Sequence, residues 1–538
     1  MAEPLWYKNT TFYQVYLRAF ADSNGDGHGD LKGLEGRLDY LKDLGVDCVW
    51  LMPIYPSPLK DDGYDVADFY QIAGIYGSLE DFKSLLQALH ARGMRLIMDL
   101  VLNHTSDQHH WFQAARADRN SPYRDYYVWS DDDQKYRDVR IIFVDVEPSN
   151  WTWDPDAGQF YWHRFYASQP DLNYDNPRVQ EEMLNIARFW LDLGIDGFRA
   201  DAVPYLFERD GTNCENLAET HVFLKRLRAF MDREYPGRIL LCEANQRAEN
   251  VREYFGNSDE FQMGFHFPLM PRLFMSLKKG RSEDLRDILL QTPAIPDECQ
   301  WCIFLRNHDE LTLEMVTPEQ RLWMWEQYAP EPRMRQNLGI RRRLAPLMDN
   351  DARKIRLINS MLMTLPGSPI IYYGDEIVMG DNIWLPDRNG VRTPMQWTRG
   401  ANAGFSSAAT DSLFSPVVSD SVYGPARVNV ADQQQTEDSL WHAIRGLLHT
   451  RKAHPAFGWG ELDWLDPGND RIAAYRRRYR EETVLVVQNL SDSEERLSME
   501  VDRPGTLKDL LTGKRYESTG SRLDLALAPY EYLWLDNS

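Results

Sequence analysis

The stretch RLIMDLVLNH, residues 95–104, is the clearest sign of how this chain folds. It is a short apolar run rich in β-forming residues that ends in the polar pair Asn103-His104. An amphipathic helical pattern precedes it at residues 79–92, and another apolar run precedes that helix at residues 48–51. Alternation of strand, helix and strand is typical of a parallel sheet whose crossovers are helices.

The same alternation recurs along most of the chain. Apolar runs occur at residues 12–16, 48–51, 95–102, 197–199, 239–242, 261–265, 302–305 and 370–373, and helical patterns at 31–44, 79–92, 178–193, 216–235 and 352–365. About eight strand–helix units are the number expected for a (β/α)8 barrel. We therefore predict an α/β fold built on a TIM barrel.

Two stretches interrupt the alternation, and a third ends it. Residues 105–173 are rich in aromatic and charged residues and too long for a plain loop, so they predict a small inserted domain. Residues 310–350 are charged and helical in pattern. We expect both interruptions to act as lids, which Arg–Glu or Arg–Asp pairs between them would hold closed. From residue 455 short alternating runs predict an antiparallel β domain. The predicted organisation is a barrel over residues 1–104 and 174–454, an insertion at 105–173 and a C-terminal domain at 455–538.

Composition narrows the classes of partner. The formal net charge of −22 argues against nucleic acid and against an anionic membrane surface. No apolar stretch reaches the length of a membrane span, and the first residues lack a secretory signal pattern, so we expect a cytoplasmic protein. The 17 Trp and 27 Tyr include rings on which sugars could stack, which mildly favours a carbohydrate substrate.

The five cysteines do not suggest a disulfide framework. Cys299 and Cys302 form a single C-x-x-C pair, with no second pair and no histidine cluster beside it. Zinc binding or redox chemistry is the alternative, but buried reduced thiols are the favoured interpretation.

Charged residues follow several of the predicted strands. Asp201 follows the fourth, Glu243 the fifth and Asp309 the seventh, with Arg199 and His308 beside them. One such acid alone would be an ordinary surface residue. Because strand ends of a barrel meet at one mouth, three acids there predict a catalytic site.

Two of these carboxylates suit glycoside hydrolysis with retention of configuration, in which the pair lies about 5–5.5 Å apart. Arg199 and Asp201 are two residues apart on a strand, so both side chains point the same way. A guanidinium so close should lower the pKa of Asp201 and keep it ionised as a nucleophile. Glu243 follows an apolar run, and desolvation should keep it protonated as the acid.

Four motifs resemble those of the α-amylase family (glycoside hydrolase 13): DLVLNHTS at 99–106, GFRADAV at 197–203, LCEANQ at 241–246 and RNHDE at 306–310. The resemblance covers essentially the whole chain. It implies that Asp201 is the nucleophile, Glu243 the acid/base and Asp309 a third carboxylate that stabilises the transition state. It also implies substrate-binding roles for Asp61, Tyr64, His104, Phe165, Gln169, Arg199, His308 and Arg392. Asp61, or its neighbour Asp62, and Arg392 would close the far end of the pocket around a terminal glucose.

The sequence also suggests structural calcium. Asp22, Asn24, Asp26, His28 and Asp30 place ligands at alternating positions with glycine at the sixth, as at the start of an EF-hand loop. Position twelve is Gly33 rather than Glu, so Asp30 would have to contribute, and a solvated acidic turn is the alternative. The family resemblance implies a second Ca²⁺ site, which would use Asn103, Asp171, Tyr205, Leu206 and Glu208. A polar loop network is the alternative there, and no organic cofactor is expected.

Two further segments, residues 338–350 and 380–398, resemble most the family members that interconvert maltose and trehalose. Ala202, directly after the nucleophile, resembles members that act on α-1,4 bonds. We therefore expect an isomerase that takes these disaccharides, with minor hydrolysis to glucose. An exo-acting α-1,4-glucosidase is the main alternative, and a non-catalytic sugar-binding protein a distant one. Many family members associate, so a homo-oligomer is compatible with the resemblance.

Overall fold

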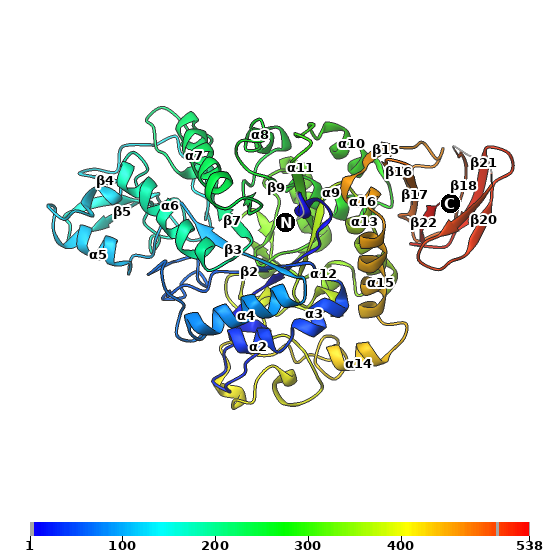
Figure 1. Cartoon of the computed structure of the whole chain (residues 1–538), viewed down its shortest axis with the longest axis horizontal. Coiled ribbons are helices and arrows are strands. Elements are labelled where there is room, and N and C mark those ends of the chain that lie inside the picture. Colours follow the sequence, from blue (N-terminus) through cyan, green and yellow to red (C-terminus); the bar gives the residue numbers. More distant parts are fainter. Residues whose placement is uncertain (1–4, 502–504, 537–538) are drawn as a thin grey trace.

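A closed barrel of eight parallel strands forms the centre of the computed structural model, which describes residues 5–501 and 505–536 (Figure 1). The strands are β1 (Phe12–Val15), β2 (Cys48–Leu51), β3 (Arg95–Val101), β7 (Gly197–Asp201), β8 (Ile239–Cys242), β9 (Met263–Phe265), β10 (Gln300–Phe304) and β14 (Ser368–Tyr372). Every residue of β1, β2 and β8 is buried, as the continuous apolar runs of a parallel sheet require. The predicted α/β barrel is confirmed.

Helices cover the outside of the barrel. They include α4 (Leu79–Ala91), α6 (Pro177–Asp192), α7 (Ala218–Glu234), α8 (Ala248–Glu253), α9 (Leu269–Lys279), α10 (Glu283–Gln291), α13 (Ala352–Thr364) and α15 (Leu440–Ala453). α6 shows how local sequence sets a boundary, because Asn176 caps its first turn and Pro177 occupies the first position. The helix predicted over residues 31–44 is instead two helices, α2 (Leu31–Glu35) and α3 (Leu38–Leu44), because the chain turns at Gly36.

A close approach of backbones sets the pairing of the two strands that carry the site. Gly197 opens β7 and pairs with Ile239, the first residue of β8. A Cβ atom at Gly197 would lie 2.3 Å from the main-chain oxygen of Ile239, so only glycine fits there. The two strands therefore run side by side to their carboxyl ends.

The first insertion has a sheet and a core of its own. Its strands β4 (Trp129–Ser130), β5 (Trp151–Asp154) and β6 (Gln159–Trp162) form an antiparallel sheet in the order β4-β6-β5. Val139, Trp151, Trp162 and Cys214 make a separate hydrophobic cluster under it. In Figure 1 this region, drawn in cyan, lies at one end of the long axis of the molecule.

The second insertion is less helical than the sequence predicts. It contains α11 (Pro318–Tyr328), but also an antiparallel sheet of β11 (Leu311–Thr312), β13 (Gly339–Ile340) and β12 (Arg335–Gln336). Gly339 allows this sheet to pack, since a Cβ there would lie 2.6 Å from the side chain of Glu310. This sheet folds back over the loop that follows β10.

The C-terminal region is antiparallel β structure at the other end of the long axis (Figure 1). One sheet contains β15 (Glu461–Trp464), β16 (Ile472–Tyr479), β17 (Glu482–Asn489), β22 (Tyr532–Asp536), β19 (Thr506–Asp509) and β20 (Arg515–Glu517), and a second pairs β18 (Glu495–Glu500) with β21 (Arg522–Leu527). A hydrophobic cluster that includes Val487, Leu523 and Leu535 fills this region. In the described residues we find no helix whose length and apolar character would let it cross a lipid bilayer.

Candidate active site

Three carboxylates lie at the carboxyl-terminal edge of the barrel. Asp201 ends β7, Glu243 follows β8 directly, and Asp309 lies in the loop after β10. They share one pocket with a volume of about 120 Å³. The same pocket is lined by Asp61, Tyr64, His104, Ile142, Phe143, Phe165, Tyr205, Asn245, His308, Glu310, Glu314 and Arg388.

Arg199 lies beneath this pocket rather than in its lining. Its guanidinium is 2.5 Å from Asp99 Oδ1, 2.5 Å from Asp201 Oδ1 and 2.5 Å from Glu243 Oε1. Trp50 donates to the second oxygen of Asp99 at 2.7 Å, so this acid is held from two sides. The arginine thus compensates buried charge under the pocket, and its substrate-binding role stays a prediction.

The two carboxylates on β7 and after β8 have separated pKa values. Burial raises the pKa of Asp201 to about 6, although Arg199 opposes the shift. Burial raises the pKa of Glu243 to about 8. Arg199 does lower the pKa of Asp201, as the sequence argument expects, but loss of solvent outweighs the guanidinium and the net shift is upward. The order remains that of a nucleophile and an acid at neutral pH.

Asp309 is surrounded by donors. His308 Nε2 is 3.0 Å from its Oδ2, while Arg388 and Arg392 reach its Oδ1 at 2.7 and 3.1 Å. Burial acts in the opposite sense, but His308 and Arg388 hold the pKa of Asp309 well below its usual range. Asp309 is therefore ionised, and it can accept hydrogen bonds from sugar hydroxyls.

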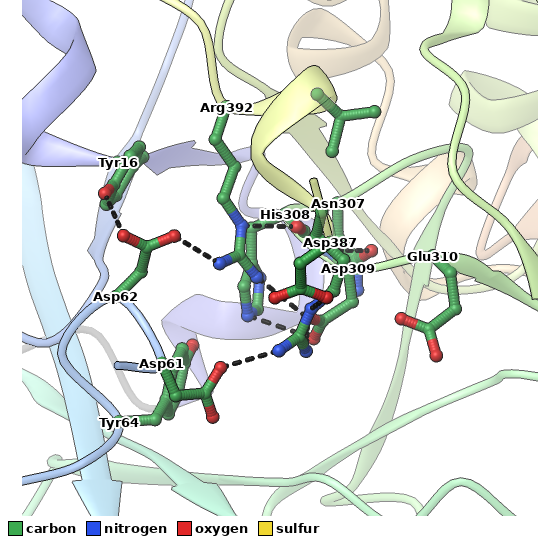
Figure 2. A network of polar contacts seen from close by, with 12 residues as sticks. Tyr16, Asp61, Asp62, Tyr64, Asn307, His308, Asp309, Glu310, Asp387 and Arg392 are labelled. Atoms are coloured by element: carbon green, nitrogen blue, oxygen red, sulfur yellow. Dashed lines mark hydrogen bonds and ion pairs between the residues drawn. The ribbon is translucent and has the colours of Figure 1, made fainter. Parts of the chain in front are cut away.

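The far end of the pocket is closed by an arginine that the sequence argument missed. Asp61 Oδ1 is 2.6 Å from Arg388. Arg392 instead pairs with Asp62 at 2.6 Å (Figure 2). Tyr16 holds the other oxygen of Asp62 at 2.8 Å, away from the lining of the pocket. The sequence left open whether Asp61 or Asp62 acts with Arg392. The structure pairs Arg392 with Asp62 and places Arg388, not Arg392, beside Asp61 in the pocket lining. The available signal was position: Arg388 lies four residues before Arg392.

The remaining predicted sugar-binding residues surround the same space. The Tyr64 ring stacks on His308 with centroids 5.2 Å apart and an interplanar angle of 13°. Gln169 donates to Asp61 Oδ2 at 2.9 Å and lies 3.3 Å from His104 Nε2. Phe165 lines the pocket, whereas Gln169 is not among the lining residues and contacts Asp61 and His104, which are.

Contacts between the two insertions lie across the mouth of the pocket. Arg140, from the first insertion, is 2.6 Å from Glu314 in the second and 2.8 Å from Glu215. The Asn337 backbone N–H donates to Asp145 Oδ2 at 2.6 Å. The Arg140 side chain is 40% exposed, so this contact lies at the surface, next to Glu314 in the pocket lining. Arg140–Glu314 is an Arg–Glu pair of the kind that the sequence predicts between the two insertions, but sequence spacing does not identify the residues that form it.

The acidic loop after β1 is satisfied by its own chain. Asp22 accepts hydrogen bonds from the backbone N–H groups of Asn24, Gly25 and Gly27, and Asp30 caps α2 through Gly33 N–H. The side chain of His28 accepts from Arg18 Nε at 3.1 Å, so a metal there would use other atoms of this residue. These bonds are also those of an acidic turn, so they do not favour calcium over that alternative.

The second predicted calcium site has oxygens without partners. Asn103 Oδ1, Asp171 Oδ2 and Glu208 Oε1 are buried and lack a hydrogen-bond partner within the described chain. Burial raises the pKa of Asp171 to about 8 and that of Glu208 well above its usual value. No cluster of three or more His, Cys, Asp or Glu placed for a metal occurs among residues 5–501 and 505–536. Two carboxylates, one amide oxygen and the main-chain oxygens of Tyr205 and Leu206 nevertheless fit the oxygen ligands that Ca²⁺ takes.

Comparisons with known proteins agree with this geometry. The catalytic domain of α-amylase matches residues 14–328 and 340–460, and the C-terminal domain of maltogenic amylase matches residues 462–534. The trehalose synthase/amylase of Mycobacterium tuberculosis is 57% identical over 91% of this chain and 83% of its own length. The trehalose synthase of Pimelobacter sp. is 54% identical over 91% of this chain and 88% of its own. An α-amylase from H. orenii superposes with a TM-score of 0.81, at 29% identity over 99% of this chain and all of the other. This chain is a member of the α-amylase family.

Proposed function

We propose that this protein is a trehalose synthase, an isomerase that interconverts maltose and trehalose and releases a little glucose by hydrolysis. Relatives of that name at 54–57% identity over about nine-tenths of the chain support it. The structural observation that carries it is the pair of contacts, Arg140–Glu314 and Asp145–Asn337, by which the two insertions meet over the pocket. An isomerase of this kind must retain a free glucose between two chemical steps and keep water out.

The mechanism is a double displacement. Asp201 attacks the anomeric carbon of the terminal glucosyl unit as the bond to the bridging oxygen breaks, and Glu243 gives that oxygen its proton. A glucosyl-enzyme ester and a free glucose result. The glucose turns in the closed pocket, and its anomeric hydroxyl attacks the anomeric carbon of the enzyme-bound glucosyl unit while Glu243 takes back a proton. Asp201 leaves, and the configuration at the transferred carbon is retained.

Two alternatives use the same pocket differently. An exo-acting α-1,4-glucosidase would keep the carboxylates but let glucose leave and water enter. The weak point of closure is Arg140, since exposed ion pairs contribute only about 0.2–1 kcal/mol each. A non-catalytic sugar-binding protein is the distant alternative. The separated pKa values of Asp201 and Glu243 argue against it, because binding alone does not require a proton donor beside an ionised acid.

Maltose alone, incubated with the purified protein, distinguishes these candidates. Trehalose as the main product is expected, with glucose a minor one, and Asp201→Asn should form neither. Adding excess ¹³C-glucose sharpens the test, because an intramolecular transfer leaves the trehalose unlabelled. Glucose as the main product would assign the glucosidase activity instead. Maltose binding without any conversion would support the sugar-binding alternative.

We further propose that Ca²⁺ is structural in this protein and that the site of Asn103, Asp171 and Glu208 holds it more firmly than the loop 22–30. Bound there, the ion would neutralise two buried carboxylates and join the end of the first insertion to the loops after β3 and β7. Metal analysis should find calcium, and a chelator should lower the Tm of the wild type. Glu208→Gln should remove this sensitivity, while Asp22→Asn should retain most of it. A Tm indifferent to chelator, in protein free of calcium, would overturn the proposal.

The cysteines bear on the cellular location of the protein. All five cysteines are buried and unpaired in the structure. Free thiols of this kind fit a reducing compartment, which supports a cytoplasmic enzyme acting on a soluble disaccharide.

A further inference from the structure

Gln14 lies under the pocket and was singled out by no sequence motif. It is on β1, its side chain is fully buried, and its amide Nε2 is 2.6 Å from His308 Nδ1. On the other side of the imidazole, Nε2 is 3.0 Å from Asp309 Oδ2. The ring therefore bridges a neutral amide and an ionised acid.

The chemistry of these neighbours decides where the imidazole carries its proton. An amide nitrogen can only donate, so His308 Nδ1 must accept from Gln14. A neutral ring has one proton, which then resides on Nε2 and is donated to Asp309. Only this tautomer lets Gln14 Nε2 donate to the ring and the ring donate to Asp309, while Gln14 Oε1 has no hydrogen-bond partner among the described residues.

The opposite orientation of the amide does not fit. Turning Gln14 by 180° would aim its oxygen at Nδ1, which would then need a proton. Because Asp309 also requires a proton on Nε2, the ring would have to be an imidazolium. Burial, helped by Arg392 and Arg199 and opposed by Asp309, lowers the pKa of His308 to about 4. The charged ring is thus disfavoured at neutral pH.

Other contacts fix the ring plane but not its protonation. Tyr64 stacks on one face, and the edge of Trp50 meets the ring with centroids 5.9 Å apart at 87°. Arg392 donates to the main-chain oxygen of His308 at 2.8 Å. Among these neighbours only Gln14 touches Nδ1, so it is the group that can select the tautomer.

We propose that Gln14 is a positioning residue, which holds His308 as the neutral tautomer with its proton on Nε2. His308 then presents its single N–H donor to Asp309, and so orients that carboxylate toward the pocket. The other tautomer would aim a lone pair at the carboxylate of Asp309. This inference rests on the proposed function, since it concerns how the same pocket handles its substrate.

Two substitutions of Gln14 test it through kinetics. Gln14→Leu removes the donor, and Gln14→Glu replaces it with an acceptor of the same shape. We expect kcat to fall by about 10–100-fold in both, the scale for groups that orient a functional histidine. KM should change far less. Gln14→Glu should also add an ionisation to the pH profile, because a carboxylate at Nδ1 raises the pKa of His308.

A matched control separates this effect from a loss of packing. Gln300 is also a buried glutamine on a barrel strand, but it donates to the main-chain oxygens of Lys8 and Gly458. Gln300→Leu is expected to reduce Tm and to leave kcat and its pH profile unchanged. If Gln14→Glu matches the wild type in kcat and pH profile, Gln14 has no positioning role.

The tautomer itself is measured in the wild type, which needs no variant to fold. Protein labelled with ¹⁵N in histidine should show His308, identified by its loss in His308→Asn, with a protonated Nε2 and a bare Nδ1. A proton on Nδ1 would overturn the proposal. This NMR measurement does not depend on which product forms. If the wild type only hydrolysed maltose, the proposed isomerase activity would be wrong, but the proposed tautomer of His308 would still stand.

Discussion

The floor of the pocket and its mouth are built in opposite ways. At the floor, Arg199 is 1% exposed and lies 2.5 Å from each of three carboxylates on or beside barrel strands. At the mouth, Arg140 is 40% exposed and its partners come from loops and insertions. Buried charges are strongly coupled, whereas exposed pairs are weak and screened.

This difference predicts that the two regions control different properties. The floor sets the rate of glycosidic bond cleavage and formation, and the mouth sets the ratio of the two products. The floor fixes the acids that make and break glycosidic bonds, so changes there should alter both products equally. The mouth decides how long glucose stays and whether water enters, so changes there should alter the ratio of glucose to trehalose. A contact that must open in each catalytic cycle to exchange substrate cannot be a strong one.

The largest effect is expected from the nucleophile. Asp201→Ala removes the group that forms the glucosyl-enzyme, and we expect trehalose formation and hydrolysis to fall together by about 10⁴-fold or more. Initial rates from maltose with both products quantified measure this. If hydrolysis persists while trehalose formation is lost, the two reactions do not use the same nucleophile.

Arg388 tests the floor at its far end. Arg388→Lys keeps the charge but cannot bridge Asp61 and Asp309, now 2.6 and 2.7 Å from the guanidinium. Loss of one charge-assisted hydrogen bond, about 1.5–3 kcal/mol, predicts a fall of about 10–100-fold in kcat/KM. The product ratio should not move, and Arg399→Lys, on an exposed arginine, is the control. A changed ratio of glucose to trehalose would mean that Arg388 affects the retention of glucose, as the contacts at the mouth do.

The sequence predicts the catalytic residues of the floor because the patterns that indicate them are local. Apolar runs predict the strands, and a strand's end predicts where Asp201 and Glu243 lie. The sequence does not predict contacts that depend on the course of a loop or on residues far apart in the chain. Whether Arg388 or Arg392 reaches Asp61 depends on the course of a loop, and both arginines look equally suitable in the sequence. Arg140 and Glu314 are 174 residues apart, and nothing local pairs them.

The pKa of Asp201 shows a second limit. The sequence shows that Arg199 is near, and a nearby cation lowers an acid's pKa. It does not show how completely the site is buried, and burial reverses the net direction. The net effect of burial and of Arg199 on the pKa of Asp201 can be judged only from the three-dimensional structure.

The pH profile is the next test of the floor. With pKa values of about 6 for Asp201 and about 8 for Glu243, kcat/KM should be bell-shaped with a maximum near neutrality. Below pH 6 Asp201 gains a proton and loses its nucleophilicity, and above pH 8 Glu243 loses the proton it must donate. One pH unit below the lower value, about tenfold of the rate should be lost. Because the two acids interact, the fitted values belong to the pair. A flat profile between pH 5 and 9 would contradict the assignment.

The smallest effect, and the one specific to the mouth, is expected from Arg140. Arg140→Ala removes exposed ion pairs with Glu314 and Glu215, together about 1 kcal/mol, so the closed state should become about 2–5-fold less populated. The glucose-to-trehalose ratio should rise by a similar factor, while total consumption of maltose changes little. Glu314→Gln should shift the ratio in the same direction, and the double variant by less than the sum if the pair acts as one contact. Raising the salt concentration should mimic both in the wild type, since the pair faces solvent. An unchanged ratio in all three conditions would mean that the mouth does not control the fate of glucose, and the closure would have to lie deeper, at Phe143 and Tyr205 in the pocket wall.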